Sequence, residues 1–285
     1  MLKAYYQLTK PGIIYGNILT ATAGFLFATK LRHIHIGLLL ATLIGTALVI
    51  AAACVFNNYI DRGIDKKMAR TKKRALVQGA IPARNALVYA TVLVLAGFGV
   101  LIAKTNWLVV GIGLVAFIDY VVLYGFYKRR SVYGTIVGSI SGAAPVVAGY
   151  CAVTDRFDGA ALILFLILVL WQMPHFYAIA MYRFDDYKNA GLPVLPVKKG
   201  WHATKVQIVV YIAAFVLAVG SLTAFGYAGY IFGIIMMLVG VAWLRQGIRG
   251  FTTDDNRQWA RKLFFVSLLV ILALSIMLSV GSRLA

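Results

Sequence analysis

Three polar side chains stand four residues apart at the end of a long apolar run. Asn57, Asp61 and Asp65 occur in the segment VFNNYIDRGIDKK. In a helix this spacing places all three on one face, where two like charges one turn apart cost about 0.2–0.5 kcal/mol. A divalent cation would turn that repulsion into ligation, and Mg²⁺ prefers hard oxygen ligands of this kind. The spacing therefore predicts a magnesium site with Asp61 and Asp65 as ligands.

The composition makes this pair unusual and indicates the class of protein. The 285 residues include nine Asp and no Glu, and 61% of them are hydrophobic. Such a chain is a polytopic membrane protein rather than a soluble domain. The formal net charge of +19 does not indicate nucleic-acid binding. The basic residues lie in loops between apolar runs, where they act as topology signals and as partners for anionic substrate or lipid.

We expect an all-α membrane protein with nine transmembrane helices, because only helices satisfy the backbone of an open chain in lipid. The predicted spans cover residues 12–29, 37–58, 85–103, 107–127, 132–153, 160–182, 206–225, 228–245 and 263–281. The chain is interpreted as one domain, residues 1–285, without a removable signal peptide. Spans two to five and six to nine are candidates for two related halves, residues 37–153 and 160–281.

The distribution of Lys and Arg predicts the orientation in the membrane. Of the 28 basic residues, 23 fall on the side that carries the N-terminus. The other side has only Lys30, Arg32, Lys104, Arg156 and Arg283. Because Lys and Arg collect in cytoplasmic loops, we expect a cytoplasmic N-terminus, an external C-terminus and insertion into the inner membrane of a bacterium.

Two further features lie inside the predicted spans. Span five contains Gly134, Gly138 and Gly142, a smooth stripe against which another helix or a flat ligand can lie closely. Asp119 falls in the middle of span four. An ionisable residue at that depth is a functional hypothesis by default, and a hydrogen-bonded structural Asp is the alternative interpretation.

Basic residues follow the acidic face directly. Arg70, Lys72 and Arg74 would lie at headgroup level, where a guanidinium presents a planar fork to phosphate oxygens. Acids for a metal beside bases for phosphate suit a membrane-soluble diphosphate whose tail lies among the helices. A solvated loop next to the membrane is the alternative interpretation.

A second polar cluster occupies residues 171–197. Pro174 stands inside span six, and His175 follows about two turns from the cytoplasmic end. A histidine inside a span usually faces the interior of the bundle. The rim after this span carries Arg183, Asp185, Asp186 and Tyr187. We therefore expect two acidic rims, after spans two and six, to face each other across one cavity.

These motifs resemble the UbiA superfamily of intramembrane prenyltransferases. Its pattern NxxxDxxxD followed by RTxxR matches Asn57, Asp61, Asp65, Arg70, Thr71 and Arg74. Other segments are similar to the protohaem IX farnesyltransferase branch of that superfamily. They are TKPGII-GN at 9–17, SVYGT with SGAAP at 131–145, WQMPH at 171–175 and DYxxxxxPVLPV at 186–197.

The resemblance implies a fold, a reaction and partners. It implies nine helices around a central cavity and transfer of a farnesyl group from farnesyl diphosphate to a vinyl group of haem B. The products would be haem O and diphosphate, formed through Mg²⁺-assisted ionisation to an allylic cation. Haem B is then a substrate, Mg²⁺ the cofactor and the lipid bilayer the surroundings, with no nucleic acid involved. Haem A synthase or a terminal oxidase assembly is implied as a contact, because it would use the product.

The resemblance also suggests roles for individual residues. The expected catalytic residues are Asn57, Asp61, Asp65, Arg70 and Asp186, of which Asp61, Asp65 and Asp186 would bind the metal. The expected substrate-binding residues are Lys10, Asn17, Lys72, Arg74, His175, Arg183, Asp185 and Tyr187, and the haem propionates would pair with Lys128, Arg129 or Arg130. One departure from the wider superfamily is Tyr182, which stands where a second DxxxD motif would begin.

Two other functions remain open from the sequence. A prenyltransferase of the same fold acting on a quinone precursor, such as 4-hydroxybenzoate, would share the first motif, although WQMPH and PVLPV argue against it. A membrane transporter would also carry polar residues inside its spans. However, transporters place their sites near the midplane, whereas the acids of this chain gather at one rim.

Overall fold

The computed structural model describes residues 1–29 and 34–281, and it is helical with connecting turns over these residues. The elements in chain order are α1 (Leu2–Leu8), α2 (Pro11–Thr29), α3 (Ile36–Asp65), α4 (Ala83–Lys104), α5 (Trp107–Ile118), the π-helix η1 (Asp119–Leu123), α6 (Tyr124–Tyr127), α7 (Gly134–Thr154), α8 (Gly159–Tyr182), α9 (Phe184–Asn189), α10 (Leu195–Ala224), α11 (Tyr230–Ile248), the 3₁₀-helix η2 (Arg249–Thr252) and α12 (Asn256–Gly281).

Within the described residues, nine helical segments are long and apolar enough to cross a membrane. This confirms the predicted number of spans and the all-α class. Three helices extend beyond their predicted limits, because polar residues continue them outside the apolar run. α3 continues to Asp65, α10 begins at Leu195 and α12 begins at Asn256. Three residues of the topology prediction, Lys30, Arg32 and Arg283, lie outside the described residues.

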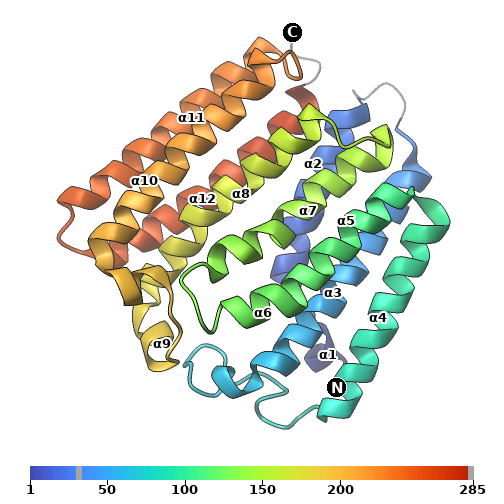
Figure 1. The fold of residues 1–285 in the computed structure, drawn as a ribbon, viewed down its shortest axis with the longest axis vertical. Coiled ribbons are helices and arrows are strands. Elements are labelled where there is room, and N and C mark those ends of the chain that lie inside the picture. Colours follow the sequence, from blue (N-terminus) through green and yellow to red (C-terminus); the bar gives the residue numbers. More distant parts are fainter. Residues whose placement is uncertain (30–33, 282–285) are drawn as a thin grey trace.

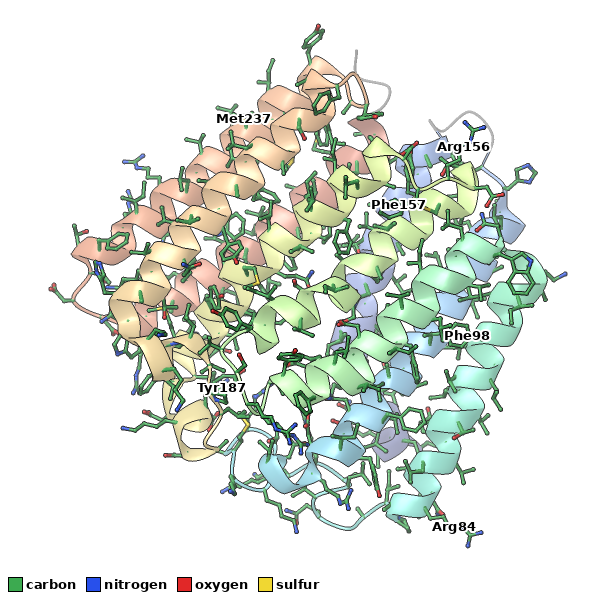
Figure 2. All side chains as sticks on the ribbon, viewed as in Figure 1. Arg84, Phe98, Arg156, Phe157, Tyr187 and Met237 are labelled. Atoms are coloured by element: carbon green, nitrogen blue, oxygen red, sulfur yellow. The ribbon has the colours of Figure 1, made fainter. Side chains whose placement is uncertain are left out.

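The two ends of the helical bundle differ in what they carry. The N-terminus, α9 and the loop of residues 66–82 share one end, and α12 finishes at the other (Figure 1). Arg84 and Tyr187 lie at the first end, whereas Arg156 lies at the second (Figure 2). An odd number of crossings requires this separation of the chain ends. We refer to the end with α9 as the motif end, because the helix α3, which carries Asn57, Asp61 and Asp65, finishes there.

Small residues allow α2 and α7 to approach each other closely in the core. A Cβ atom at Gly149 would lie 2.0 Å from the carbonyl oxygen of Ala21, and one at Gly24 would lie 2.0 Å from that of Val146. Small residues at a helix crossing let two backbones meet, and this is a main source of packing energy between helices in lipid. The α2–α7 contact therefore has no space for larger side chains.

The predicted glycine stripe of α7 is covered by the chain itself. A Cβ atom at Gly134 would lie 2.6 Å from Cα of Lys128, and one at Gly138 would lie 2.7 Å from the ring of Tyr124. At Gly142 the amide of Gln172 fills the same space. Of the two interpretations of this stripe, close packing of the chain's own elements is the one that the structure supports.

The α2–α7 crossing predicts a difference between two glycine substitutions. Gly149→Ala should destabilise the protein by about 1–3 kcal/mol, the usual cost of overpacking a core. Gly99→Ala is the matched control, because Gly99 is exposed on α4 with no neighbour within 4 Å. Thermal unfolding of both purified variants checks this, and an equal midpoint for the two would contradict the close contact.

Candidate active site

The acidic face of α3 is buried at the motif end. Asn57, Asp61 and Asp65 are 2%, 7% and 5% exposed, on successive turns of one helix. This confirms that the spacing of four places them on one inward face. A buried carboxylate is costly unless it pairs with a cation or accepts hydrogen bonds. The partners of these two Asp residues are therefore important for the local structure.

Asp61 forms ion pairs with two basic residues that follow α6. Lys128 Nζ forms an ion pair with Asp61 Oδ2, and Arg129 Nη2 lies 3.0 Å from Asp61 Oδ1. The same guanidinium donates to the carbonyl of Ile60 at 2.7 Å. Burial lowers the pKa of Lys128, and the negative charge of Asp61 opposes this shift.

These contacts reveal a partner that the sequence did not suggest for the basic trio Lys128, Arg129 and Arg130. Lys128 and Arg129 contact Asp61 in this structure, and the pairing of Lys128, Arg129 or Arg130 with haem propionates stays a prediction. The third member, Arg130, stacks on the ring of Phe126 at 3.8 Å. The sequence predicted that the basic trio and the acidic face of α3 lie on the same side of the membrane. It did not predict that they contact each other, because the two segments are far apart in the chain.

Asp65 forms an ion pair and a hydrogen bond with the chain segment that follows α3 and folds back toward it. Arg74 Nη1 lies 2.7 Å from Asp65 Oδ2 and donates to Asn58 Oδ1 at 3.0 Å. Thr71 Oγ1 donates to the carbonyl oxygen of Asp65 at 3.0 Å. Asn58 was missed by the motif analysis, yet it is buried and its Nδ2 donates to the carbonyl of Leu8. Arg74 therefore reaches the site from a loop, not from a continued helix.

Asn57 is contacted by a lysine in an uncommon backbone conformation. Lys10 joins α1 to α2 with a φ of 53°, a left-handed conformation that few residues other than Gly adopt. Its Nζ donates to Asn57 Oδ1 at 2.8 Å, and burial lowers the pKa of Lys10 to about 8. Asn57 Nδ2 is buried without a partner in the described part of the chain. Such an unpaired donor is costly in the free protein and available to a ligand.

The second acidic rim meets the first through Asp186. The backbone N–H of Ala69 donates to Asp186 Oδ1 at 3.1 Å, which ties α9 to the loop after α3. Met68 and Leu192 pack together in a small apolar cluster at the same junction. The contact brings the rims after spans two and six together, and the expectation that they face each other across one cavity stays a prediction. A metal-binding role for Asp186 stays a prediction.

The remaining residues of the second rim lie nearer to the surface. Asp185 forms an exposed ion pair with Arg257, with 2.8 Å between Oδ2 and Nη1. Arg183 is exposed and lies over the ring of Tyr182 at 4.9 Å. Tyr187, labelled in Figure 2, is partly buried, and burial raises its pKa. Their roles in substrate binding stay predictions.

The predicted substrate residues outside this rim also differ in their surroundings. Arg70 and Lys72 are exposed on the loop that follows α3. Asn17 donates from Nδ2 to the carbonyl of Ile13 in its own helix at 2.8 Å. The structure therefore brings Lys10 and Arg74 to the acidic face, while it leaves Arg70, Lys72 and Asn17 without a contact to it.

His175 is held in a fixed orientation inside α8. Its Nδ1 lies 2.7 Å from Ser267 Oγ on α12, and its ring stacks on Trp171 with centroids 4.8 Å apart. The side chain is 9% exposed. No hydrogen bond to Nε2 occurs within residues 1–29 and 34–281. With Nδ1 engaged and the ring fixed, Nε2 is the atom that can meet a ligand, as second contacts to metal-binding His residues typically arrange.

The donor set at α3 fits a magnesium ion that is shared with a substrate. In the described part of the chain, no group of three or more His, Cys or Asp side chains is close enough to hold a metal. Mg²⁺ is usually bound through one or two carboxylates together with substrate phosphates, not by a cage of protein ligands. Asp61 and Asp65 provide such a pair of hard oxygen donors, with basic groups beside them.

The buried ion pair predicts a larger effect on stability than the exposed one. Arg74→Met leaves the Asp65 carboxylate buried without its cation, which typically costs about 3–5 kcal/mol. Arg257→Met removes the exposed pair with Asp185, where about 0–1 kcal/mol is expected. Thermal unfolding of the two variants compares them directly. Equal midpoints would mean that Asp65 does not depend on Arg74.

The fold is similar to that of several solved structures. A digeranylgeranylglyceryl phosphate synthase structure superimposes with a TM-score of 0.80 at 19% identity, over 99% of this chain and 98% of that one. A UbiA homologue from Archaeoglobus fulgidus, bound to DMAPP and Mg²⁺, gives a TM-score of 0.71 at 17% identity, over 96% and 98% of the two chains. At these identities the likeness concerns the fold alone.

Sequence relatives are much closer. The protoheme IX farnesyltransferase of Serratia proteamaculans is 54% identical, over 98% of this chain and 95% of the relative. That of Sodalis glossinidius is also 54% identical, over the same shares. The model of the UbiA prenyltransferase family matches residues 17–269. This match covers most of the chain and includes the buried acidic face of α3, so the chain belongs to the UbiA prenyltransferase family.

Proposed function

We propose that this protein transfers a farnesyl group from farnesyl diphosphate to a vinyl group of haem B, giving haem O and diphosphate. Relatives with this activity in their names share about half of the residues over nearly the whole chain. The observation that carries the proposal is the charge around α3. Three cationic side chains pair with the buried carboxylates of Asp61 and Asp65, and a fourth donates to Asn57 on the same face; they are Arg74, Lys128, Arg129 and Lys10.

This surplus of positive charge suits a diphosphate. Asp61 and Asp65 would hold a Mg²⁺ ion, which would supply positive charge to the diphosphate. The lysine and arginine side chains that pair with the two carboxylates would then be free to bind phosphate oxygens. Arg74 offers a planar fork and Lys128 a compact ammonium. The unpaired Nδ2 of Asn57 is a further donor on the same face. Together these groups bind the head of the substrate at the membrane edge.

The first chemical step breaks the bond between C1 of the farnesyl group and the diphosphate oxygen. The electron pair leaves with the diphosphate, and an allylic cation remains. Arg74, Lys128 and Arg129 stabilise the negative charge that grows on the leaving group. Removing one such contact typically costs about 2.7–4 kcal/mol of transition-state stabilisation. No covalent nucleophile on the protein is required.

The second step forms a carbon–carbon bond. The π electrons of the haem vinyl group attack C1 of the allylic cation, which moves the positive charge to the vinyl carbon next to the porphyrin. A water oxygen then adds to this carbon and loses a proton, which yields the hydroxyethylfarnesyl side chain. Ring faces stabilise nearby cations, and Tyr120 and Tyr124 stack at 5.5 Å close to the acidic face. These rings also keep water away from the first cation.

The location of the site is consistent with the proposed orientation. We infer an inner-membrane protein of a bacterium with a cytoplasmic N-terminus, because most Lys and Arg residues accompany the motif end. A cytoplasmic motif end would meet farnesyl diphosphate at its polar head, while the farnesyl tail enters from the lipid. Haem A synthase or a terminal oxidase assembly is proposed as the recipient of the product.

The product of the reaction tests the proposed function. Purified protein with Mg²⁺, farnesyl diphosphate and haem B should give a porphyrin whose mass increases by one farnesyl group and one hydroxyl group. Asp61→Asn and Asp65→Asn should each lower the rate about 10²–10³-fold, the usual effect of losing electrostatic stabilisation of a leaving group. Asp254→Asn is the matched control, because Asp254 is exposed in the turn before α12 and lies outside the proposed site.

Two outcomes would contradict this assignment. Prenylation of 4-hydroxybenzoate without any haem product would identify a quinone-precursor enzyme instead. Near-normal turnover of both Asp variants at saturating Mg²⁺ would remove the acidic face from the mechanism.

The fixed ring of His175 predicts an effect on haem binding. His175→Ala should weaken haem B binding and shift its absorption spectrum, because Nε2 is the atom left to ligate iron when Nδ1 is engaged with Ser267. A haem titration followed in the visible spectrum measures both quantities. Unchanged affinity and spectrum would exclude His175 as an axial ligand.

A further inference from the structure

Asp119 is a buried acidic residue that the proposed mechanism does not use. It lies within the fourth span and is 2% exposed. The backbone N–H of Ser141 on α7 donates to its Oδ2 at 3.1 Å. Its Oδ1 is buried without a partner in the described part of the chain. An ionisable group in a span is expensive and usually has a function, so a purely incidental position is a poor explanation.

Asp119 is also the first residue of a π-turn. The π-helix η1 runs from Asp119 to Leu123, and the N–H of Tyr124 donates to the carbonyl of Asp119. A hydrogen bond that spans five residues instead of four absorbs one extra residue into the helix. Single π-turns of this kind are rare and are frequent at functional sites. Every residue after the turn is therefore shifted by one place relative to an uninterrupted α-helix.

The segment after the π-turn places three side chains in a row that ends at the acidic face: Tyr120, Tyr124 and Lys128, which we call the column. Tyr120 and Tyr124 stack with centroids 5.5 Å apart and planes at 24°. Lys128 Nζ lies 4.9 Å from the centroid of Tyr124 and forms the ion pair with Asp61. The Gly138 position, where a Cβ would meet the Tyr124 ring at 2.7 Å, accommodates this column and little else.

A regular α-helix would present different side chains at the same places. Without the extra residue, Leu123 would take the place of Tyr124 against Gly138. Tyr127 would take the place of Lys128 beside Asp61. The ammonium group of Lys128, which pairs with the buried carboxylate of Asp61, would thus be replaced by the neutral phenol of Tyr127. The π-turn is what aligns this column with the site.

We propose that Asp119 is a positioning residue for diphosphate binding. By accepting the N–H of Ser141, its carboxyl group ties the start of the π-turn to α7 and holds the register that brings Tyr124 and Lys128 to Asp61. Asp119 itself does not contact the substrate in this arrangement. The inference rests on the proposed function only for the identity of the ligand, a prenyl diphosphate with Mg²⁺.

The experiment measures binding of farnesyl thiodiphosphate with Mg²⁺ by calorimetry on the full-length protein. Asp119→Leu removes the acceptor, so the turn should relax and the affinity should fall about tenfold or more, as for loss of one charge-assisted contact to phosphate. Asp119→Asn keeps an oxygen that accepts the Ser141 N–H, and it should bind like the wild type. Thermal unfolding of each variant accompanies the titrations.

A compensating deletion separates register from stability. Deleting Val122, which is 57% exposed, removes the extra residue, so a regular helix then presents Tyr124 and Lys128 correctly. The deletion should restore binding in the Asp119→Leu background and leave it unchanged in the wild-type background. If Asp119→Leu does not fold, insertion of Ala after Val122 tests the same point, because it shifts Lys128 while Asp119 is intact, and it should abolish binding.

Several results would overturn this proposal. They are wild-type affinity of Asp119→Leu, equal losses in Asp119→Leu and Asp119→Asn, no rescue by the deletion, and normal binding after the insertion. Failure of the proposed function is distinguishable, because it would appear in the wild-type protein as absence of a farnesylated porphyrin, whatever the behaviour of the Asp119 variants.

Discussion

Two negative charges buried at one edge of an apolar bundle govern the structure around them. Asp61 and Asp65 are almost inaccessible, and the low dielectric of the interior makes an unanswered carboxylate very costly. Each carboxylate pairs with cations from a different segment. Arg74, from the loop after α3, pairs with Asp65, whereas Lys128 and Arg129, after α6, pair with Asp61. The folded path of both segments follows from this requirement.

The arrangement of cations also connects stability to function. In the proposed mechanism, the groups that neutralise the carboxylates in the free protein are the ones that would bind the diphosphate once a metal ion replaces them. The site is therefore preorganised, since the binding groups are already ordered and partly dehydrated before the substrate arrives. Lys10, held in a left-handed conformation beside Asn57, is an example of local strain accepted at such a site.

Close helix packing gives this polar edge a rigid support. Gly24 and Gly149 let α2 and α7 meet backbone to backbone, and Gly138 receives the ring of Tyr124. In lipid, where burial of apolar surface does little to drive helices together, such contacts provide much of the cohesion. Because α7 is fixed by α2, it can serve as the reference against which Asp119 sets the register of the helix after the π-turn.

The sequence by itself determined the features that depend on local periodicity. Apolar runs of about twenty residues are typical of membrane spans, so nine helices were predictable. A spacing of four places Asn57, Asp61 and Asp65 on one face of any helix. The same logic identified the glycine stripe of span five. It did not reveal what covers that stripe, because several partners fit a smooth surface equally well.

Only the tertiary structure decided which distant groups meet. Lys128 lies 67 residues from its partner Asp61, and the N–H that Asp186 accepts comes from a residue 117 positions away. No local pattern encodes such pairs, because the intervening helices and loops set the distance between them. Likewise the extra residue of the π-turn that begins at Asp119 is invisible to helical periodicity counted along the sequence, which would have placed Tyr127 beside Asp61.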